Sequence, residues 1–278
     1  MAVKRTSYSY DTFEREGQVQ EFERLYHQAS VLLETERELW PSMNIVAGQS
    51  VLDVGCGAGI VTHELAKQVY PAQATGIDLS HSLLRHGQST YACVEKDERS
   101  AQTVFHQGSV YELPFPQDSF DIVYARLLFQ HLSEPLQALE NIWRVLKPGG
   151  RLCVLDIDKD WSSLYPEPDT PVQLDRAIVE KQVSEGGDPW VGRKLGSYLR
   201  SSGFEKVKTN ISLIDSDQLG LSNYFGMLSF GRSYQAEDSQ FAAMREEVRP
   251  ALQALLDGSY AWAGFGLFVV TGQKIALH

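Results

Sequence analysis

The sequence has few cysteines, no cysteine spacing typical of a metal site, and no apolar run long enough to cross a bilayer. Its three cysteines form no C-x-x-C pair, which argues against a disulfide framework and a zinc site. The longest apolar run near the end, FGLFVV, is far shorter than the roughly 20 residues of a membrane-spanning helix. The first residues, MAVKRTSYSYDTFEREG, lack the apolar core of a secretory signal. We therefore expect a cytoplasmic protein with reduced thiols and no membrane partner.

Basic residues are also scarce. The chain of 278 residues has 25 Lys and Arg against 36 Asp and Glu, which gives a formal net charge of -11. No run rich in Lys or Arg stands out. Because nucleic acid is a polyanion whose binding proteins usually carry a basic surface, we expect no nucleic-acid partner. The charge favours a small-molecule partner, and it leaves a monomer and a homodimer equally open.

Short apolar runs alternate with stretches of helical spacing between residues 50 and 158. The runs are SVLDVG, ATGIDL, TVFHQGS, FDIVYA and GRLCVLDID, each bounded by Gly, Asp or Ser as buried parallel strands usually are. The clearest helical stretch is SEPLQALENIWRVLKPGG, with Ser133 as the expected N-cap and Gly149 or Gly150 as the expected stop. This alternation predicts an α/β fold with a doubly wound, mostly parallel sheet.

Two flanking segments have a different character. Residues 1–48 include an amphipathic helix expected over Gln18–Trp40, and residues 215–260 are rich in aromatics and helix formers. No repeat, low-complexity tract or flexible linker separates them from the alternating region. We therefore expect one domain over residues 1–278, with 1–48 as a helical cover and 215–260 as a helical lid insertion.

A glycine-rich turn follows the first predicted strand, in the stretch VLDVGCGAGI. Glycine permits a tight turn and lets a ligand approach the backbone closely. The dinucleotide fingerprint G-x-G-x-x-G/A needs a small third residue, but counting from Gly55 that place holds Ile60. A phosphate-binding P-loop needs a Lys after its last glycine, and none follows here. The turn is therefore typical of neither phosphate-binding loop.

Five motifs in order resemble the class I S-adenosylmethionine-dependent methyltransferases over roughly residues 48–158. They are DVGCGAG, GIDLS with its acid at the end of the second strand, HQGSVYELPF, the strand FDIVYA, and LKPGGRLCVLD. The resemblance implies a methyltransferase that uses S-adenosylmethionine and releases S-adenosylhomocysteine. It also implies a Rossmann-like sheet of seven strands in which the last strand is antiparallel.

The resemblance assigns expected roles around the adenosyl group. Asp78 would accept hydrogen bonds from both ribose hydroxyls, which suits a carboxylate. Leu79 would pack on adenine, and the backbone amide of Val110 would contribute nearby. Ser109 stands where the family commonly has an Asp that accepts from the adenine amine, and a hydroxyl is the weaker acceptor.

A second group of residues is expected near the methionine portion of the cofactor. The resemblance puts Asp53 and the turn of Gly55 and Gly57 beside it. Gln28, in a helix similar to that of bacterial small-molecule methyltransferases, would reach the cofactor or its neighbourhood. Arg126 follows the fourth strand, where a guanidinium would suit the cofactor carboxylate, although a surface ion pair is an equal alternative.

The methyl acceptor is expected beyond the carboxyl ends of the strands. His131 is the one histidine in the two stretches expected at this edge, YARLLFQHL and DIDKDW, so it is our candidate base; a hydrogen bond to nearby backbone is the alternative. Asp156, Asp158 and Asp160 would suit Mg²⁺ as oxygen ligands, but alternate residues beside a strand end point to two faces. We favour no metal and expect Asp158 to contact the acceptor. Tyr224 is expected to line its pocket, with core packing as the alternative.

The same loops lack the motifs of enzymes that methylate macromolecules. YARLLF stands where amino-methylating DNA enzymes have [N/D]-P-P-[Y/F/W], and no cysteine follows a proline as cytosine-carbon methylation requires. The pair of glutamates used by protein arginine methyltransferases is also missing after the fourth strand. We therefore expect methylation of oxygen or nitrogen on a small, partly aromatic secondary metabolite. Carbon methylation of a quinone-type ring and binding of the cofactor without catalysis remain alternatives.

Overall fold

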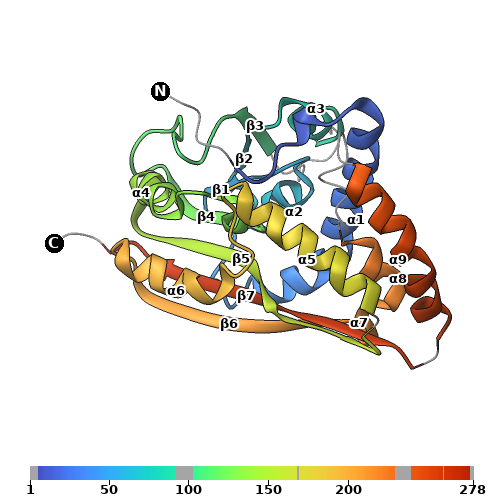
Figure 1. The fold of residues 1–278 in the computed structure, drawn as a ribbon. Helices are drawn as coiled ribbons and strands as arrows, with labels where there is room; N and C mark the ends of the chain where they lie inside the picture. Colours follow the sequence, from blue (N-terminus) through green and yellow to red (C-terminus); the bar gives the residue numbers. More distant parts are fainter. Residues whose placement is uncertain (1–5, 92–102, 168, 229–238, 259, 276–278) are drawn as a thin grey trace.

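A seven-stranded sheet with helices on both faces forms the centre of the computed structural model (Figure 1). The structure describes residues 6–91, 103–167, 169–228, 239–258 and 260–275. The strand order is β3-β2-β1-β4-β5-β7-β6, and β7 runs antiparallel to both of its neighbours. The strands are β1 (Val51–Val54), β2 (Ala74–Asp78), β3 (Thr103–Gln107), β4 (Phe120–Arg126), β5 (Leu146–Tyr165), β6 (Glu205–Asp215) and β7 (Trp262–Gln273). The predicted Rossmann-like fold, with its antiparallel last strand, is confirmed.

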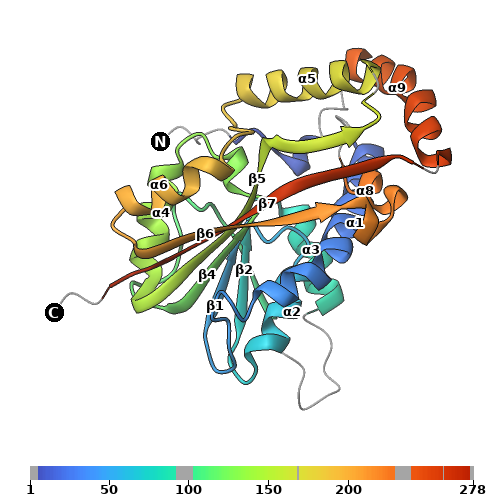
Figure 2. The same cartoon turned by 90° about the horizontal axis from the view of Figure 1, so that it is seen from below.

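Helices cover the two faces of the sheet in separate groups (Figure 2). On one face lie α1 (Arg15–Leu39), α2 (Ile60–Val69), α3 (His81–Tyr91) and α8 (Leu221–Gly226). On the other lie α4 (Pro135–Val145) and α6 (Gly192–Ser201). The remaining helical segments are the short η1 (Tyr10–Thr12), η2 (Phe129–His131) and α7 (Ser216–Leu219), and the longer α5 (Asp169–Ser184) and α9 (Ser239–Asp257). Among the described residues, no helix is both long and apolar enough to span a membrane.

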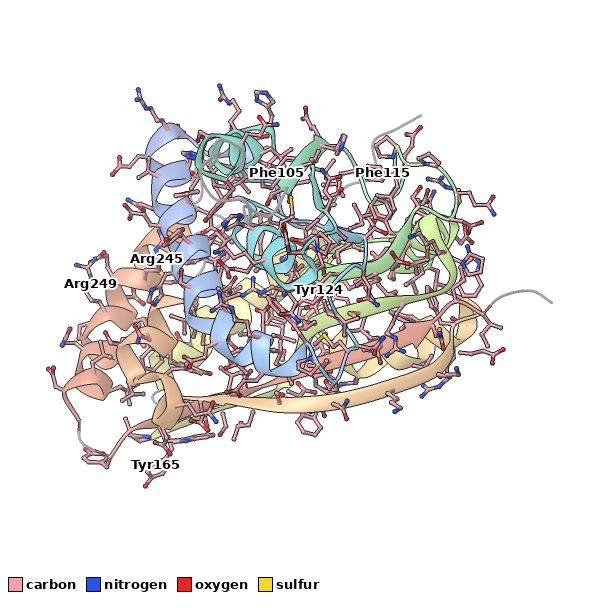
Figure 3. All side chains as sticks on the ribbon, turned by 180° about the vertical axis from the view of Figure 1, so that it is seen from behind. Phe105, Phe115, Tyr124, Tyr165, Arg245 and Arg249 are labelled. Carbon is pink, nitrogen blue, oxygen red and sulfur yellow. The ribbon has the colours of Figure 1, made fainter. Side chains whose placement is uncertain are left out.

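Successive residues of the buried strands contribute to two different cores. Ile122 and Tyr124 of β4 pack with α1 and α2, whereas Val123 and Ala125 pack with α4 and α6. This is the period of two that places alternate side chains on opposite faces of a sheet. Tyr124 is fully buried and lies deep inside the molecule in Figure 3. Because both faces are covered at the centre of the sheet, β1 and β4 are apolar over most of their length, whereas the edge strand β6 is largely polar and exposed.

The stretch around LKPGG differs from the prediction. Helix α4 ends at Val145, and Leu146 already has an extended conformation (φ -70°, ψ 137°), so neither Gly149 nor Gly150 stops the helix. Leu146 already pairs with Phe120 of β4, and Pro148 disfavours the helical region for Lys147 before it, so the chain continues as a strand. At the other end the N-cap is Glu134 rather than Ser133.

Strand β5 is also longer than predicted. The segment KDWSSLY, which follows the predicted strand GRLCVLDID, continues β5 and pairs antiparallel with β7, from Ser162 opposite Phe265 to Tyr165 opposite Trp262. The two strands extend past the end of the parallel sheet, and α5 and α9 lie together beside this extension (Figure 2). The expected lid of residues 215–260 contains α7, α8 and α9, and its residues 229–238 and 259 lie outside the described residues.

Candidate active site

A cavity of about 450 Å³ opens at the carboxyl ends of β1, β2, β4 and β5. Its lining comes from the loops after these strands, from η1 and α1 of the N-terminal segment, and from α5 and α8. It includes most of the residues that the sequence singled out: Gln28, Asp53, Gly55, Gly57, Asp78, Leu79, Ser109, Val110, Arg126, His131 and Tyr224. Asp158 does not belong to the lining.

The glycine turn between β1 and α2 exposes its backbone to the cavity. Gly55, Gly57 and Gly59 all have positive φ values, of 73°, 55° and 75°, which favour glycine over any other residue. A Cβ on Gly59 would meet the ring of Phe105 at 2.3 Å, so this glycine is needed for packing. Next to Gly57, by contrast, a Cβ would meet nothing within 4 Å, so a ligand can approach the backbone there.

Asp78 faces the cavity at the end of β2. Its two carboxylate oxygens accept hydrogen bonds from the backbone N–H groups of Gly57 and Ser80, each at 2.8 Å. Burial raises the pKa of Asp78, while these hydrogen bonds oppose that rise. Each oxygen keeps a further lone pair, so the carboxylate can accept hydrogen bonds from a ligand. Leu79 follows with a half-exposed side chain at the rim.

Asp53 is a buried carboxylate at the end of β1. It accepts a hydrogen bond of 2.6 Å from the hydroxyl of Thr62, and 2% of its surface is exposed. Burial raises the pKa of Asp53 to about 7, although Thr62 and the charge of Arg126 act in the opposite direction. The carboxyl group is therefore poised between its neutral and charged forms near neutral pH, and a cation placed beside it would favour the charged form.

Arg126 lines the cavity, but its charge is already paired. Its Nε donates to Glu36 of α1, and the same carboxylate accepts a hydrogen bond of 2.8 Å from the hydroxyl of Tyr124. Nη2 of Arg126 donates to the backbone carbonyl of Gln28 at 3.5 Å. Arg126 therefore forms an ion pair, as the alternative prediction expected, but the pair is buried and does not lie on the surface. Its position beside Gln28 ties α1 to the end of β4.

The loop after β3 presents backbone rather than a charged side chain. The hydroxyl of Ser109 accepts a hydrogen bond of 3.2 Å from the N–H of Tyr111, which makes a local turn. Gly108 donates its N–H to the carbonyl of Asp78 at 2.9 Å, which holds this loop against the end of β2. Ser109 and Val110 both line the cavity.

His131 lies on the opposite side of the cavity, at the end of η2. Its Nδ1 is 2.9 Å from the hydroxyl of Ser7, and its ring lies 5.4 Å from the ring of Tyr8. Burial, and then the charge of Arg24, lower the pKa of His131 to about 4. The imidazole is therefore neutral near neutral pH, which leaves it able to accept a hydrogen bond but makes it a weak proton acceptor.

The N-terminal segment crosses between the two sides of the cavity. Thr6 forms a β-bridge with Leu132, and the N–H of Ser7 donates to the carbonyl of His131 at 3.1 Å. Further along, the carboxylate of Asp11 accepts hydrogen bonds at the start of α3, including 2.9 Å from the hydroxyl of Ser80. The segment from Thr6 to Asp11, which we call the N-terminal strap, therefore joins the loops after β4 and β2.

The three acids after β5 do not converge on one point. In place of the expected contact with an acceptor, Asp158 is 1% exposed and accepts a hydrogen bond of 2.6 Å from Nε of Arg193. Asp160 pairs with Nη2 of the same arginine, whereas Asp156 accepts backbone N–H groups on the other face. The alternation of side chains along the strand explains this separation. Within the described ranges, no group of three His, Cys, Asp or Glu side chains is placed to hold a metal ion.

One wall of the cavity was not anticipated as part of the site. Helix α5 contributes Asp175, Ile178, Val179 and Gln182 to the lining, at the i, i+3, i+4 and i+7 spacing of a single helix face. Residues 172–183 have helical spacing in the sequence, but the mixed polar and apolar character of this face resembles that of any surface helix. The spacing alone could have shown that these side chains share a face, but not what the face covers.

A buried ion pair on α1 was also missed. Nε and Nη2 of Arg24 donate to Glu21 at 2.9 and 2.7 Å, and Nη1 donates to the carbonyl of Met227 at 3.0 Å. The hydroxyl of Tyr8 donates to the same glutamate at 3.0 Å. This pair therefore joins α1, the N-terminal strap and the segment after α8, three parts that enclose the cavity. On a helix, Glu and Arg three apart usually form a solvated pair, so the burial of this pair could not be predicted from its spacing.

Comparison with known proteins places this site in context. The family described as Methyltransferase domain matches residues 52–154. The chain is 32% identical over 190 residues to O-methyltransferase rstn1 of Aspergillus nomiae, and this alignment covers 68% of the chain and 77% of that protein. It is 35% identical over 153 residues to an uncharacterized methyltransferase of Schizosaccharomyces pombe, an alignment that spans about half of each protein, 53% and 54%.

Among solved structures, the fold is similar to that of phosphoethanolamine N-methyltransferase 2 of Haemonchus contortus in complex with S-adenosylmethionine. The TM-score is 0.64 at 17% identity, with 96% of this chain and 60% of that chain covered. At this identity the similarity describes the fold, and the acceptor has to be argued from the side chains of the cavity.

Proposed function

Because this chain belongs to the class I S-adenosylmethionine-dependent methyltransferases, we propose that it transfers the methyl group of S-adenosylmethionine to an oxygen atom of a small, partly aromatic metabolite. The observation that carries the proposal is the continuity of one cavity. The carboxylates and glycine turn of a nucleoside site form one half of it, and His131, Tyr224 and the inner face of α5 form the other. A donor and an acceptor held in these two halves would be in contact.

The residues of the first half fit the cofactor chemically. Asp78 is a half-buried carboxylate that keeps free lone pairs, which suits two ribose hydroxyls. Leu79 offers an apolar surface for adenine, while Ser109 and the amide of Val110 offer polar groups at its edge. The open space beside Gly57 would let the cofactor approach the backbone. No phosphate group has to be bound, in agreement with the lack of a P-loop lysine.

The methionine portion would lie between β1 and α1. Asp53, whose pKa burial raises to about 7, would become a full carboxylate next to the cofactor ammonium group. Arg126 and Gln28 would face this portion from the other side, with the guanidinium held in place by Glu36. In this arrangement Arg126 orients groups that contact the cofactor, and its own charge stays largely neutralised by its partner.

Methyl transfer to oxygen forms one bond between oxygen and carbon and breaks the bond between sulfur and that carbon. Bound S-adenosylmethionine would supply a methyl carbon already activated by the sulfonium charge, and the leaving group is a neutral thioether. The protein must position the acceptor in line and exclude water. His131, kept neutral by its surroundings, would accept the hydrogen bond of the acceptor hydroxyl. Because that proton becomes strongly acidic as the new bond forms, a weak base suffices to remove it.

Oxygen is favoured over nitrogen by two observations. A relative that is 32% identical over most of its length carries the name O-methyltransferase. In addition, a neutral amine attacks without a base, so it would leave the buried imidazole without a chemical role. Tyr224 and Phe265 give the acceptor half an aromatic surface, which suits a flat, partly aromatic compound such as a secondary metabolite.

The test is methyl transfer from radiolabelled S-adenosylmethionine into a host extract that is afterwards separated by size. We expect the label in the small-molecule fraction, in a product whose methyl group is released as an ether methyl on chemical analysis. Label in protein or nucleic acid would contradict the proposal. Label on nitrogen or on a ring carbon would support methyl transfer but contradict oxygen as the methylated atom. Tight binding of S-adenosylhomocysteine with no label in any fraction would favour a binding protein without catalysis.

A further inference from the structure

The acceptor half of the cavity is mostly apolar. Its walls include Ile157 of β5, Ile178 and Val179 of α5, Met227 and Leu228 after α8, and Phe265 of β7. Its polar side chains include two pairs that contact each other, Gln130 with Gln182 and Lys159 with Asp175. A molecule in this half therefore loses water around most of its surface and meets polar groups at a few points, which is how small-molecule sites obtain specificity.

Each cation in the described lining already has an acidic partner. Arg24 pairs with Glu21, Arg126 pairs with Glu36, and Lys159 pairs with Asp175. The fourth basic side chain, His131, is kept neutral by burial, which lowers its pKa to about 4. Asp175 is also the one acid of the acceptor half, since the other acids of the lining, Asp11, Asp53 and Asp78, lie on the cofactor side.

This balance of charge selects against an ionic acceptor. An ion that enters a cavity gives up its hydration, and it binds well only where an opposite charge or several hydrogen bonds replace that water. With Arg24, Arg126 and Lys159 all engaged, a carboxylate or phosphate would have to compete with Glu21, Glu36 or Asp175 for its cation. An ammonium group would find its one acid, Asp175, already paired with Lys159. An uncharged acceptor faces no such cost.

The hydroxyl of Tyr224 is a hydrogen-bond donor that has no acceptor among the described residues. Only 5% of its surface is exposed, and its ring lies 5.6 Å from the ring of Phe225 and 6.0 Å from that of Phe265. Its hydroxyl has no hydrogen-bond partner among the described residues. Since Trp40 Nε1 is the one enclosed side-chain N or O atom without a partner in the described chain, the Tyr224 hydroxyl is open to the cavity that the residue lines. Burial and the nearby charge of Asp175 raise the pKa of Tyr224, so the hydroxyl stays protonated and acts as a donor.

We propose that the acceptor is an uncharged hydroxyaromatic molecule that also carries a carbonyl oxygen, and that this oxygen receives the hydrogen bond of the Tyr224 hydroxyl against the inner face of α5. The inference rests on the proposed methyl transfer to oxygen and specifies the class of acceptor. A carbonyl oxygen is a strong acceptor without charge, so it satisfies a buried donor at the smallest cost of desolvation. Tyr224 is then a specificity-determining residue, and it takes no part in moving the proton.

Three related phenols provide the probes. Methyl gallate is uncharged and has a carbonyl oxygen, gallate has the same ring with an ionised carboxylate, and pyrogallol has the ring alone. Each is titrated by calorimetry into the full-length protein after saturation with S-adenosylhomocysteine. The proteins are the natural sequence, Tyr224→Phe, and Tyr165→Phe as the matched control. Tyr165 is 67% exposed and lies at the outer tip of β5, away from the cavity (Figure 3).

We expect methyl gallate to bind at least about tenfold more tightly than gallate, a difference of about 1.4 kcal/mol. Tyr224→Phe should weaken methyl gallate by about five- to tenfold while leaving pyrogallol and S-adenosylhomocysteine unchanged, since the variant removes a single hydrogen-bond donor. Tyr165→Phe should match the natural protein throughout.

Equal affinity for methyl gallate and gallate, tighter binding of gallate, or no binding of methyl gallate would overturn the proposal. The proposal would also be overturned if Tyr224→Phe weakened the binding of pyrogallol as strongly as that of methyl gallate. The hydroxyl would then not be hydrogen-bonded to the carbonyl oxygen. The binding of S-adenosylhomocysteine to the protein, measured before the phenols are added, separates this proposal from the proposed function. Failure to bind S-adenosylhomocysteine contradicts the proposed function itself, whereas normal binding of it without a preference for methyl gallate contradicts only the choice of acceptor.

Discussion

Asp78 shows at the scale of one residue how a carboxylate can serve both the fold and a ligand. Its oxygens hold the glycine turn through Gly57 and the start of the next loop through Ser80. We expect Asp78→Ala to weaken the binding of S-adenosylhomocysteine by about 1–3 kcal/mol, because two ribose hydroxyls lose their acceptor. Calorimetry measures this, with Asp257→Ala on the exposed side of α9 as control. Unchanged affinity would mean that the ribose lies elsewhere.

Asp53 makes cofactor binding depend on pH. Since burial raises the pKa of Asp53 to about 7, the free protein holds a proton there at acid pH. A cofactor ammonium group beside it favours the charged form, so binding releases that proton, and the affinity for S-adenosylhomocysteine should rise between about pH 5 and pH 8. The affinity is measured by calorimetry in buffers of different ionisation enthalpy, which also counts the protons released.

The matched control for Asp53 is another buried acid of the same sheet. Burial raises the pKa of Asp156 to about 7 as well, but its side chain accepts backbone N–H groups and does not line the cavity. Asp53→Asn should therefore flatten the pH dependence of binding, while Asp156→Asn should preserve it. A pH dependence that survives in Asp53→Asn would assign the proton to another group.

His131 should affect turnover far more than binding. We expect His131→Ala to lower kcat by about a hundredfold or more, in the range of general acid–base effects, while the affinity for S-adenosylhomocysteine stays within twofold. The pKa of about 4 also predicts that the ring signals of His131 in an NMR titration do not change between about pH 5.5 and pH 8. Full activity of the variant would remove His131 from the mechanism.

Individual residues differ in how far the sequence could predict them. The place of Asp53, Gly55, Gly57 and Asp78 in the cavity lining was predictable because each lies at a strand end or within three places of one. The pairing of Arg126 with Glu36 was not, since it joins residues 90 apart in the sequence and depends on how α1 docks. Asp158 had the right residue type and the right strand, but its side chain points to the face that α6 covers, where it meets Arg193.

At the scale of one element, α5 turns an ordinary amphipathic pattern into a wall of the cavity. One face lines the cavity, with Val179 among its members, and Glu180 next to it in sequence points to solvent. From the sequence we expected the lid at 215–260 and not at α5. The position of α5 follows from the long pairing of β5 with β7, which extends the chain away from the parallel sheet before α5 begins. Tertiary pairing of this kind leaves no local signal in a sequence.

A pair of substitutions on α5 tests whether this helix face selects the acceptor. Val179→Trp adds bulk inside the acceptor half, so we expect loss of methylation of the acceptor isolated from the host extract, with unchanged affinity for S-adenosylhomocysteine. Glu180→Trp adds the same side chain to the solvent side and should leave both properties unchanged. Product formation and binding are measured for both proteins. Equal activity of the two variants would show that α5 does not contact the acceptor.

At the scale of the whole molecule, the apolar side chains form large and small clusters that should differ in stability. The sheet separates two extensive cores, whereas Leu174, Phe241 and Val248 join α5 to α9 in a small cluster of their own. Charged side chains such as Arg249 point away from the body on the outer side of α9 (Figure 3). A unit held by few apolar contacts opens at a lower free energy than the core it borders.

Two leucine substitutions compare the stability of a large core with that of the small cluster between α5 and α9. Leu139 of α4 is fully buried in one of the large cores, so Leu139→Ala should lower the free energy of unfolding by about 2–5 kcal/mol and lower Tm. Leu174 is equally buried, at 1% exposure, but it belongs to the small cluster. Leu174→Ala should therefore speed amide hydrogen exchange in α5 and α9 with little change in Tm or in exchange of the sheet. If Leu174→Ala lowered Tm as much as Leu139→Ala and the whole sheet exchanged faster, the α5 and α9 pair would unfold with the core and could not open separately to admit an acceptor.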